Sequence, residues 1–134
     1  MEKLSYFFYK ILKYIDLIFN YIFKKSFLIF FNDFINKDFY TSKIINNLKI
    51  NFFIPNQVTK WRVNTLYTKE PETLEWIDSF KNYNEKPIIF WDIGSNIGLY
   101  SIYAACIHKN ILIYSFEPST SNLRVLSRNI SINN

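Results

Sequence analysis

The stretch "IIFWDIGSNIGLYSIYAA", residues 88–105, contains Gly94 and Gly98, the only two glycines of the 134-residue chain. "PIIFWD" before them is a short continuous apolar run, which is typical of a strand buried on both faces of a parallel sheet. "LYSIYAACIH" after them is apolar nearly all round, which predicts a helix packed closely on that sheet. The glycines therefore lie where a buried strand turns sharply into a helix.

A second pair of the same kind follows along the chain. "ILIYSFE" (111–117) repeats the buried-strand pattern, and "SNLRVLSRNI" (121–130) predicts an amphipathic helix with Leu123, Leu126 and Ile130 facing inward. Strand, helix, strand and helix in this order predict the right-handed crossover unit of an α/β protein. In open α/β sheets, ligands bind at the carboxyl ends of the strands.

The turn "DIGSNIG" (92–98) has the residues that such a binding edge needs. Gly94 permits the tight turn, and Gly98 removes a side chain that would collide with a ligand or with the strand. Amides at the start of the helix favour a carboxylate or a phosphate. Asp92 supplies an acceptor for a cationic or hydroxyl group, and Glu117, at the next strand tip, is placed to accept ribose hydroxyls of a nucleoside ligand.

The spacing of the glycines indicates which nucleoside cofactor is bound. The dinucleotide motif G-x-G-x-x-G would need a glycine at position 96, where this chain has Asn96. A smaller cofactor with a carboxylate, an ammonium group and a ribose fits better, and S-adenosylmethionine has all three. A nicotinamide-dependent oxidoreductase is the alternative within the same class of sites.

The segments around this turn resemble a known family. "WDIGSNIGLYSIYAA" and "SFEPSTSNLRVLSRNISIN" are similar to the start of the FkbM-type methyltransferases, whose first motif reads D-x-G-A-N-x-G-x-Y-S and whose second strand ends in F-E-P. The upstream "RVNTLYTKEPETLEWIDSF" is similar to the segment that precedes the cofactor motif in that family. The resemblance covers roughly residues 48–134.

The resemblance implies a Rossmann-like doubly wound fold and S-adenosylmethionine-dependent methyl transfer to a hydroxyl of a sugar or another metabolite. The acceptor would be a small molecule or a glycan. In the implied site, Glu117 binds the ribose, and Ser95 stands where the family usually has alanine. The implied cofactor residues are Asp92, Gly94, Ser95, Asn96, Gly98 and Glu117.

Upstream of the turn, the chain is expected to form a hairpin and a helix. "LKINFFI" (48–54) and "VTKWRVNTLY" (58–67) look like strands joined by a turn at 55–57. "EPETLEWIDSF" predicts a helix with Pro71 in its first turn and with Leu74, Ile77 and Phe80 on one stripe. Glu70 and Thr73, at its start, either reach the cofactor or only begin a surface helix.

The N-terminal part has a different character. Residues 4–23 predict a helix with one broad apolar face and with lysines on the opposite side. This helix either packs on protein or lies in the plane of a membrane, so a noncatalytic membrane-surface or interaction module using residues 1–31 is a second hypothesis. Residues 27–47 look like a polar connection that can hold a short helix. We therefore expect a helical segment over 1–47 and the methyltransferase part over 48–134.

Composition narrows the class of protein. The net charge of +5 comes from scattered lysines, so nucleic acid is not expected as a partner. Cys106, the only cysteine, is expected to be a small buried side chain. The absence of a signal sequence or a long apolar run favours a cytoplasmic protein. Without a cysteine cluster or a histidine besides His108, no metal site is expected. His108 falls near a helix end, where the helix dipole is its expected partner, and the catalytic residues stay unassigned.

The expected sheet is incomplete in this sequence. The resemblance implies a doubly wound sheet of about seven strands. The chain supplies two of them before Asn134. We therefore expect a fragment of an enzyme, with weak or no cofactor binding and no turnover by these residues alone.

Overall fold

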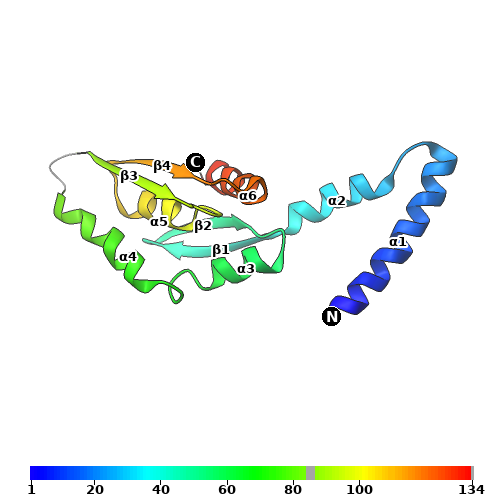
Figure 1. Cartoon of the computed structure of the whole chain (residues 1–134), viewed down its shortest axis with the longest axis horizontal. Helices are drawn as coiled ribbons and strands as arrows, with labels where there is room; N and C mark the ends of the chain where they lie inside the picture. Colours follow the sequence, from blue (N-terminus) through cyan, green and yellow to red (C-terminus); the bar gives the residue numbers. More distant parts are fainter. Residues whose placement is uncertain (84–86, 134) are drawn as a thin grey trace. The chain divides into compact units, whose positions relative to one another are not determined.

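The computed structural model describes residues 1–83 and 87–133, and it divides into two compact units, Met1–Phe39 and Tyr40–Asn134 (Figure 1). The first unit is helical and the second is mixed α/β. The elements in chain order are α1 (Glu2–Phe23), α2 (Phe27–Asp38), β1 (Tyr40–Ile45), β2 (Leu48–Phe53), α3 (Gln57–Asn64), α4 (Pro71–Asp78), η1 (Ser79–Tyr83), β3 (Ile88–Ile93), α5 (Leu99–Ile107), β4 (Ile111–Phe116) and α6 (Thr120–Ser131).

The first unit is a pair of helices in contact with each other. The expected N-terminal helix is present as α1, and a full helix, α2, occupies much of the segment expected to be a connection. The carboxylate of Asp16 in α1 accepts hydrogen bonds from the Ser26 hydroxyl and from the backbone N–H of Leu28, at 3.2 Å. Asp16 thus caps the start of α2, where a negative charge is favourable.

The second unit begins with a hairpin whose position differs from the expected one. β1 and β2 pair antiparallel, and the two residues between them, Asn46 and Asn47, have φ of 49° and 63°. Two consecutive residues with positive φ are the requirement of a type I′ turn, and asparagine tolerates this conformation. Residues 40–45 therefore belong to the sheet, and the boundary between the units lies before β1 and not after residue 47.

The expected strand over 58–67 is wrong, because α3 and its C-terminal turns occupy these residues. Asn56 accepts a hydrogen bond from the Thr59 N–H at 2.9 Å, while the Thr59 hydroxyl bonds back to the Asn56 N–H at 3.2 Å. This reciprocal cap starts a helix. Thr59 and Val63, four residues apart, form its buried side.

The helix expected after residue 70 is confirmed. α4 has Pro71 in its first turn, and Leu74 and Ile77 are buried. Phe80, in the following turn η1, packs partly buried against the same core. α4 contacts α5, so this segment covers the helix that follows the glycine turn.

The order strand, helix, strand and helix is confirmed over 88–131. β3 and β4 pair in parallel, with Asp92 opposite Ser115. α5 contacts both β4 and β1, and α6 contacts β2, so α5 lies between the two small sheets (Figure 1). The core is built from the inner sides of these elements, and its fully buried large side chains include Phe52, Phe53 and Ile97.

Two expectations about burial are wrong. In the described chain, β3 and β4 are covered on one face only, and Ile89, Trp91 and Ile93 are 62% to 77% exposed on the other. In α6, Leu123 and Ile130 are exposed, although Leu126 faces inward as expected. Polar Asn129 and neighbouring Val125 complete the buried side of α6.

Candidate functional site

The turn after β3 is fastened to the end of β4. The N–H groups of Gly94 and Ser95 donate to the carbonyl of Phe116 at 2.8 and 3.0 Å. Gly94 has φ of 82°, and a Cβ added there would meet nothing within 4 Å. Glycine is therefore needed at this position for its backbone conformation, as expected for a tight turn, and the space beside it is open.

Gly98 is needed for a different reason than the sequence suggested. It begins α5 with φ of 83°, and a Cβ there would lie 2.4 Å from Cδ1 of Leu126. The side chain that excludes a Cβ comes from α6 and not from β3. Nearby, the buried amide of Asn129 donates to the carbonyl of Ile97 at 2.9 Å and accepts from the N–H of Phe53 at 2.7 Å. α6 thus holds the turn against β2.

Glu117 and the turn face each other across the two strand tips. Oε2 of Glu117 accepts the N–H of Asn96 at 2.8 Å, and Oε1 accepts the N–H of Ser119 at 2.8 Å. Asn122 Nδ2 is 3.4 Å from Oε1. These hydrogen bonds, chiefly that from Ser119, hold the pKa of Glu117 below its ordinary value of 4.5. Asn96 has φ of 55°, so the carboxylate stabilises a residue in the left-handed region.

Asp92 is turned toward α5 and does not line the pocket described below. Its carboxylate accepts a hydrogen bond from the Ser101 hydroxyl at 2.6 Å, and that hydroxyl is also 2.7 Å from the Ser115 hydroxyl. Burial raises the pKa of Asp92 above 3.8. In this structure Asp92 therefore links β3 to α5.

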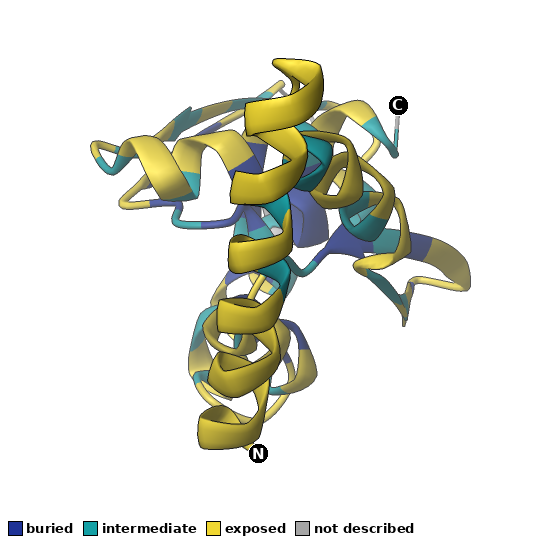
Figure 2. Cartoon of the chain, turned by 90° about the vertical axis from the view of Figure 1, so that its right-hand side faces the viewer, coloured by how far each residue is buried: buried dark blue, intermediate teal, exposed yellow. Residues whose placement is uncertain are grey.

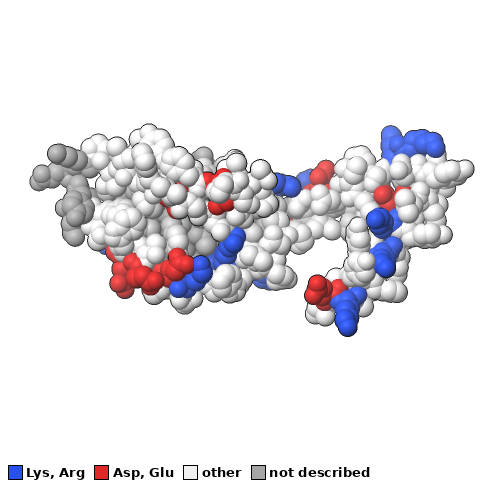
Figure 3. Space-filling model, in the orientation of Figure 1, with Lys and Arg blue, Asp and Glu red and all other residues white. Residues whose placement is uncertain are grey.

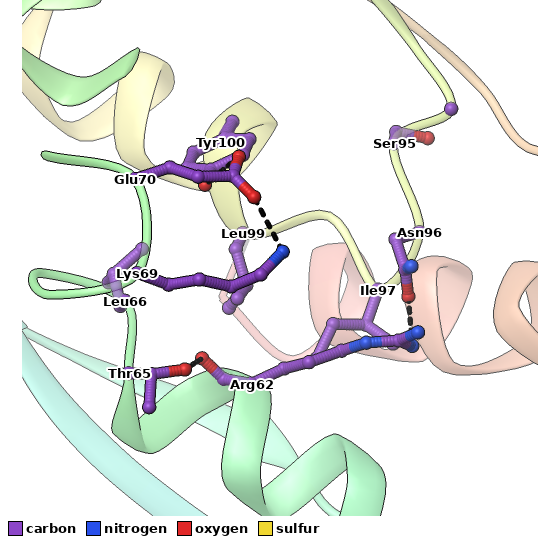
Figure 4. Close-up of a pocket in the computed structure, with 11 residues that line it drawn as sticks. Arg62, Thr65, Leu66, Lys69, Glu70, Ser95, Asn96, Ile97, Leu99 and Tyr100 are labelled. Carbon is purple, nitrogen blue, oxygen red and sulfur yellow. Dashed lines mark hydrogen bonds and ion pairs between the residues drawn. The ribbon is translucent and has the colours of Figure 1, made fainter. Parts of the chain in front are cut away.

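A cavity of about 180 Å³ lies beside the turn, between it and the segment that joins α3 to α4 (Figure 4). Its walls come from three parts of the chain: the end of α3 with the following turns, the glycine turn, and the start of α5. The lining residues are Arg62, Thr65, Leu66, Lys69, Glu70, Gly94, Ser95, Asn96, Ile97, Leu99 and Tyr100.

Charged side chains of both signs line this cavity. Arg62 donates to the Oδ1 atoms of Asn96 and Asn122, and among the described residues it forms no ion pair. Glu70 pairs with Lys69 and accepts the hydroxyl of Tyr100 at 2.8 Å. The Lys69 hydrogen bond, followed by that of Tyr100, lowers the pKa of Glu70. The cavity thus has a guanidinium bonded only to neutral groups, and an ionised carboxylate that is paired with Lys69.

The sequence patterns do not indicate Arg62, Lys69 and Tyr100 as pocket residues. They predict a strand at Arg62, which gives no position for its side chain. The Asn56 and Thr59 spacing of the helix cap would have revealed α3 and would have brought Arg62 toward the turn. Of the remaining candidates, Glu70 lines the cavity. Thr73 is not among the lining residues.

Ser95 lines the cavity, but its hydroxyl is buried without a hydrogen-bond partner among the described residues. In Figure 4 the hydroxyl is turned away from Glu70 and Tyr100. A buried hydroxyl without a partner destabilises the fold. This position would accept alanine without loss of a contact.

His108 and Cys106 lie outside this cavity. His108 follows α5, is buried, and donates from Nε2 to the carbonyl of Ile77 at 2.8 Å, with its ring 5.7 Å from that of Phe80. Its partner is therefore the end of α4, not the dipole of its own helix. Cys106 is half-buried, and burial raises the pKa of its thiol. Both side chains serve packing.

No family model, no curated protein and no solved structure matches this chain. The assignment of a ligand class must therefore come from the chemistry of the side chains. A guanidinium binds carboxylates well, and an ionised carboxylate binds an ammonium group. Arg62 and Glu70 together fit a ligand that has the two charges of an amino acid.

Proposed function

We propose that this chain binds S-adenosylmethionine and is part of a cytoplasmic O-methyltransferase resembling the FkbM type. In this proposal, Tyr40–Asn134 contributes the first part of a Rossmann-like doubly wound fold, and the acceptor is a hydroxyl of a sugar or another metabolite. The supporting topology is the parallel pair β3 and β4 with α5 between them along the chain. The resemblance of the sequence around 88–134 to that family points the same way.

The observation that carries the proposal is the position of Arg62. Its guanidinium lies at the glycine turn, lines the cavity, and is bonded to the neutral side chains of Asn96 and Asn122. A cation placed beside the amides of a helix start favours an anionic group. Glu70, on the same cavity wall, supplies the opposite charge. The methionine moiety of S-adenosylmethionine has both complementary groups.

The size of the cavity limits how much of the cofactor it can hold. Sites for drug-sized ligands have volumes of roughly 300 to 1,000 Å³. The cavity beside the turn, at about 180 Å³, suits the methionine moiety alone. The ribose would bind outside it, near Glu117, whose Oε2 accepts one N–H and keeps capacity for another donor.

When bound, S-adenosylmethionine would supply a methyl group whose bond to the sulfonium sulfur breaks as an acceptor oxygen bonds to the methyl carbon in line, so that the thioether leaves and the hydroxyl proton passes to a base. The residues described here contribute binding and orientation, which lower the barrier by holding two reactants in place. Arg62 would hold the carboxylate and Glu70 the ammonium group. Burial, followed by the hydrogen bond to Glu70, raises the pKa of Tyr100, so its hydroxyl stays protonated and keeps Glu70 oriented.

The two glycines make a direct binding experiment possible. Selective ¹⁵N-glycine labelling gives two backbone amide signals, and both residues belong to the turn. S-Adenosylmethionine at millimolar concentration is expected to shift these signals, whereas NAD is not. Shifts caused by NAD instead would favour the oxidoreductase, and two unmoved signals with either ligand would contradict cofactor binding by this chain.

A matched pair of variants on α3 tests the role of Arg62. Arg62→Gln is expected to weaken the response to S-adenosylmethionine about tenfold or more, because a charge-assisted hydrogen bond is lost. Lys60→Gln removes the same charge from an exposed position outside the cavity and should leave the response unchanged. Equal effects of the two substitutions would show that the response to S-adenosylmethionine depends on the net charge of the chain and not on Arg62.

A further inference from the structure

An unpartnered apolar stripe runs along the whole of α1. It consists of residues at positions that repeat with helical spacing, each 41% to 61% exposed, namely Leu4, Ile11, Ile15, Ile18 and Ile22. Neither α1 nor α2 contains a buried residue, and Figure 2 shows α1 exposed along almost its entire length. An exposed apolar stripe of this length marks an interaction surface.

α2 does not cover this stripe. It packs on an adjacent side of α1, where Phe8 and Leu12 face Leu28 and Ile35. The hydrogen bonds of Asp16 to Ser26 and Leu28 lie on that same side. Asp16 is the only acidic residue of α1 besides Glu2, and it lies outside the apolar stripe, bonded to the start of α2.

The opposite side of α1 is basic. Lysines lie along the helix and at the turn after it, as the blue side chains in Figure 3 show. Tyrosines stand beside them, with Lys10 Nζ 5.0 Å from the Tyr6 ring and Lys24 Nζ 5.2 Å from the Tyr21 ring. The lysines of this segment are Lys3, Lys10, Lys13, Lys24 and Lys25.

We propose that the helix pair Met1–Phe39 docks α1 flat on an anionic lipid bilayer. The stripe from Leu4 to Ile22 would enter the acyl boundary, and the lysines would stay at the level of the acidic headgroups. No described helix is long and apolar enough to cross a membrane. An interfacial helix needs apolar, aromatic and cationic side chains, because each of these groups meets a different layer of the bilayer. α1 supplies them as its isoleucine stripe, its tyrosines and its lysines.

Flotation of the full chain with vesicles tests this docking. The chain should float with vesicles of phosphatidylcholine and phosphatidylserine, and much less with phosphatidylcholine alone. Added salt should weaken the binding, because it screens the lysines. Failure to float with the acidic vesicles overturns the proposal and favours a protein partner for the stripe.

Uncharged substitutions test the stripe itself. Ile15→Gln with Ile18→Gln should weaken the partition to acidic vesicles by about tenfold or more, because apolar surface no longer enters the bilayer. Asn20→Gln, on the other side of α1, should have no effect. If the double variant floats as well as the parent chain, the stripe does not insert. If instead it unfolds residues 40–134, as circular dichroism of the Trp and Tyr region would show, the stripe packs on protein.

The contribution of the lysines has its own matched control. Lys10→Gln with Lys13→Gln should weaken binding about twentyfold, since each lysine near an acidic surface contributes a factor of about five. Lys49→Gln with Lys109→Gln makes the same change in net charge at exposed sites of the second unit and should have little effect. Equal losses in the two pairs would contradict a docking face on α1.

Discussion

The carboxylate of Glu117 accepts the backbone N–H of Asn96 at 2.8 Å. This bond joins the residue after β4 to the turn after β3, and it holds Asn96 at a φ of 55°. The relationship makes Glu117 part of the scaffold of the turn as well as a candidate ribose ligand. Substitutions at this position must therefore be measured on the free protein before any ligand is added.

Glu117→Gln should loosen the turn even without a ligand. A neutral amide accepts the N–H groups of Ser119 and Asn96 less strongly than a carboxylate. The pKa of Glu117 is lowered, so its stabilising effect is present above pH 4.5 and is lost as the pH falls through its folded-state pKa. In the ¹⁵N-glycine spectrum of the parent chain, protonation of Glu117 below pH 4.5 should move the signals of the turn. In the variant this part of the pH-dependent movement should be absent, and only the part that comes from Asp92 should remain.

Asp92 should affect stability with a pH dependence opposite to that of Glu117, and Asp92→Asn should remove this dependence. Burial raises the pKa of Asp92 above 3.8, so the folded state prefers the protonated carboxyl. The free energy of unfolding then falls as the pH rises from 3.8 through the folded-state pKa. An asparagine can still accept the Ser101 hydroxyl, so the variant should be more stable than the parent at pH 7. Urea unfolding at pH 4 and pH 7 checks this, and lower stability at pH 7 would mean that the charge of Asp92 is needed.

The two glycines should respond differently to alanine. Gly94→Ala places a side chain in open space and should cost about 1 kcal/mol for its positive φ. Gly98→Ala adds a collision with Leu126 and should cost about 3 kcal/mol. In a Leu126→Ala background the extra cost at Gly98 should disappear, which urea unfolding of the four proteins would show. Equal costs in both backgrounds would mean that α6 does not press on the turn.

Asn129→Ala should be strongly destabilising. It leaves the N–H of Phe53 and the carbonyl of Ile97 buried without their partner, at a cost of about 2 to 4 kcal/mol. Asn133, one turn later, bonds to the backbone of Asn51 in the same way but is only partly buried. Asn133→Ala is the matched control and should cost about 1 kcal/mol or less. A reversed order of the two effects would contradict the role of Asn129 as the buried link.

Ser95→Ala should raise the free energy of unfolding by about 1 kcal/mol, because it removes a buried hydroxyl that has no partner. The response of the glycine signals to S-adenosylmethionine should stay unchanged, since the hydroxyl is turned away from Glu70 and Tyr100. Thermal unfolding and the ligand titration measure the two effects. Loss of the ligand response would show that the hydroxyl turns into the cavity.

Local patterns in the sequence were sufficient for most elements of 68–131. Apolar runs of strand length flanking a glycine turn predicted β3, α5 and β4, because these patterns depend on neighbours along the chain. The predicted hairpin is only half right, because β2 is present but its partner strand is β1 and not residues 58–67. Residues 58–67 have a strand-like composition, but the cap at Asn56 starts a helix there. The paired asparagines at 46–47 are a turn signal, which is hard to recognise inside a polar segment.

The sequence by itself determined that an apolar strand ends in a glycine turn and that an acidic residue ends the next strand, since both follow from residues adjacent along the chain. Only the tertiary structure decided what surrounds the turn. Arg62 reaches it from α3 and Leu126 closes on Gly98 from α6, and contacts between residues so far apart in sequence depend on how the elements pack. The packing of the elements also decided that Asp92 bonds to Ser101 and that Glu70 and Arg62 provide the charges of the cavity.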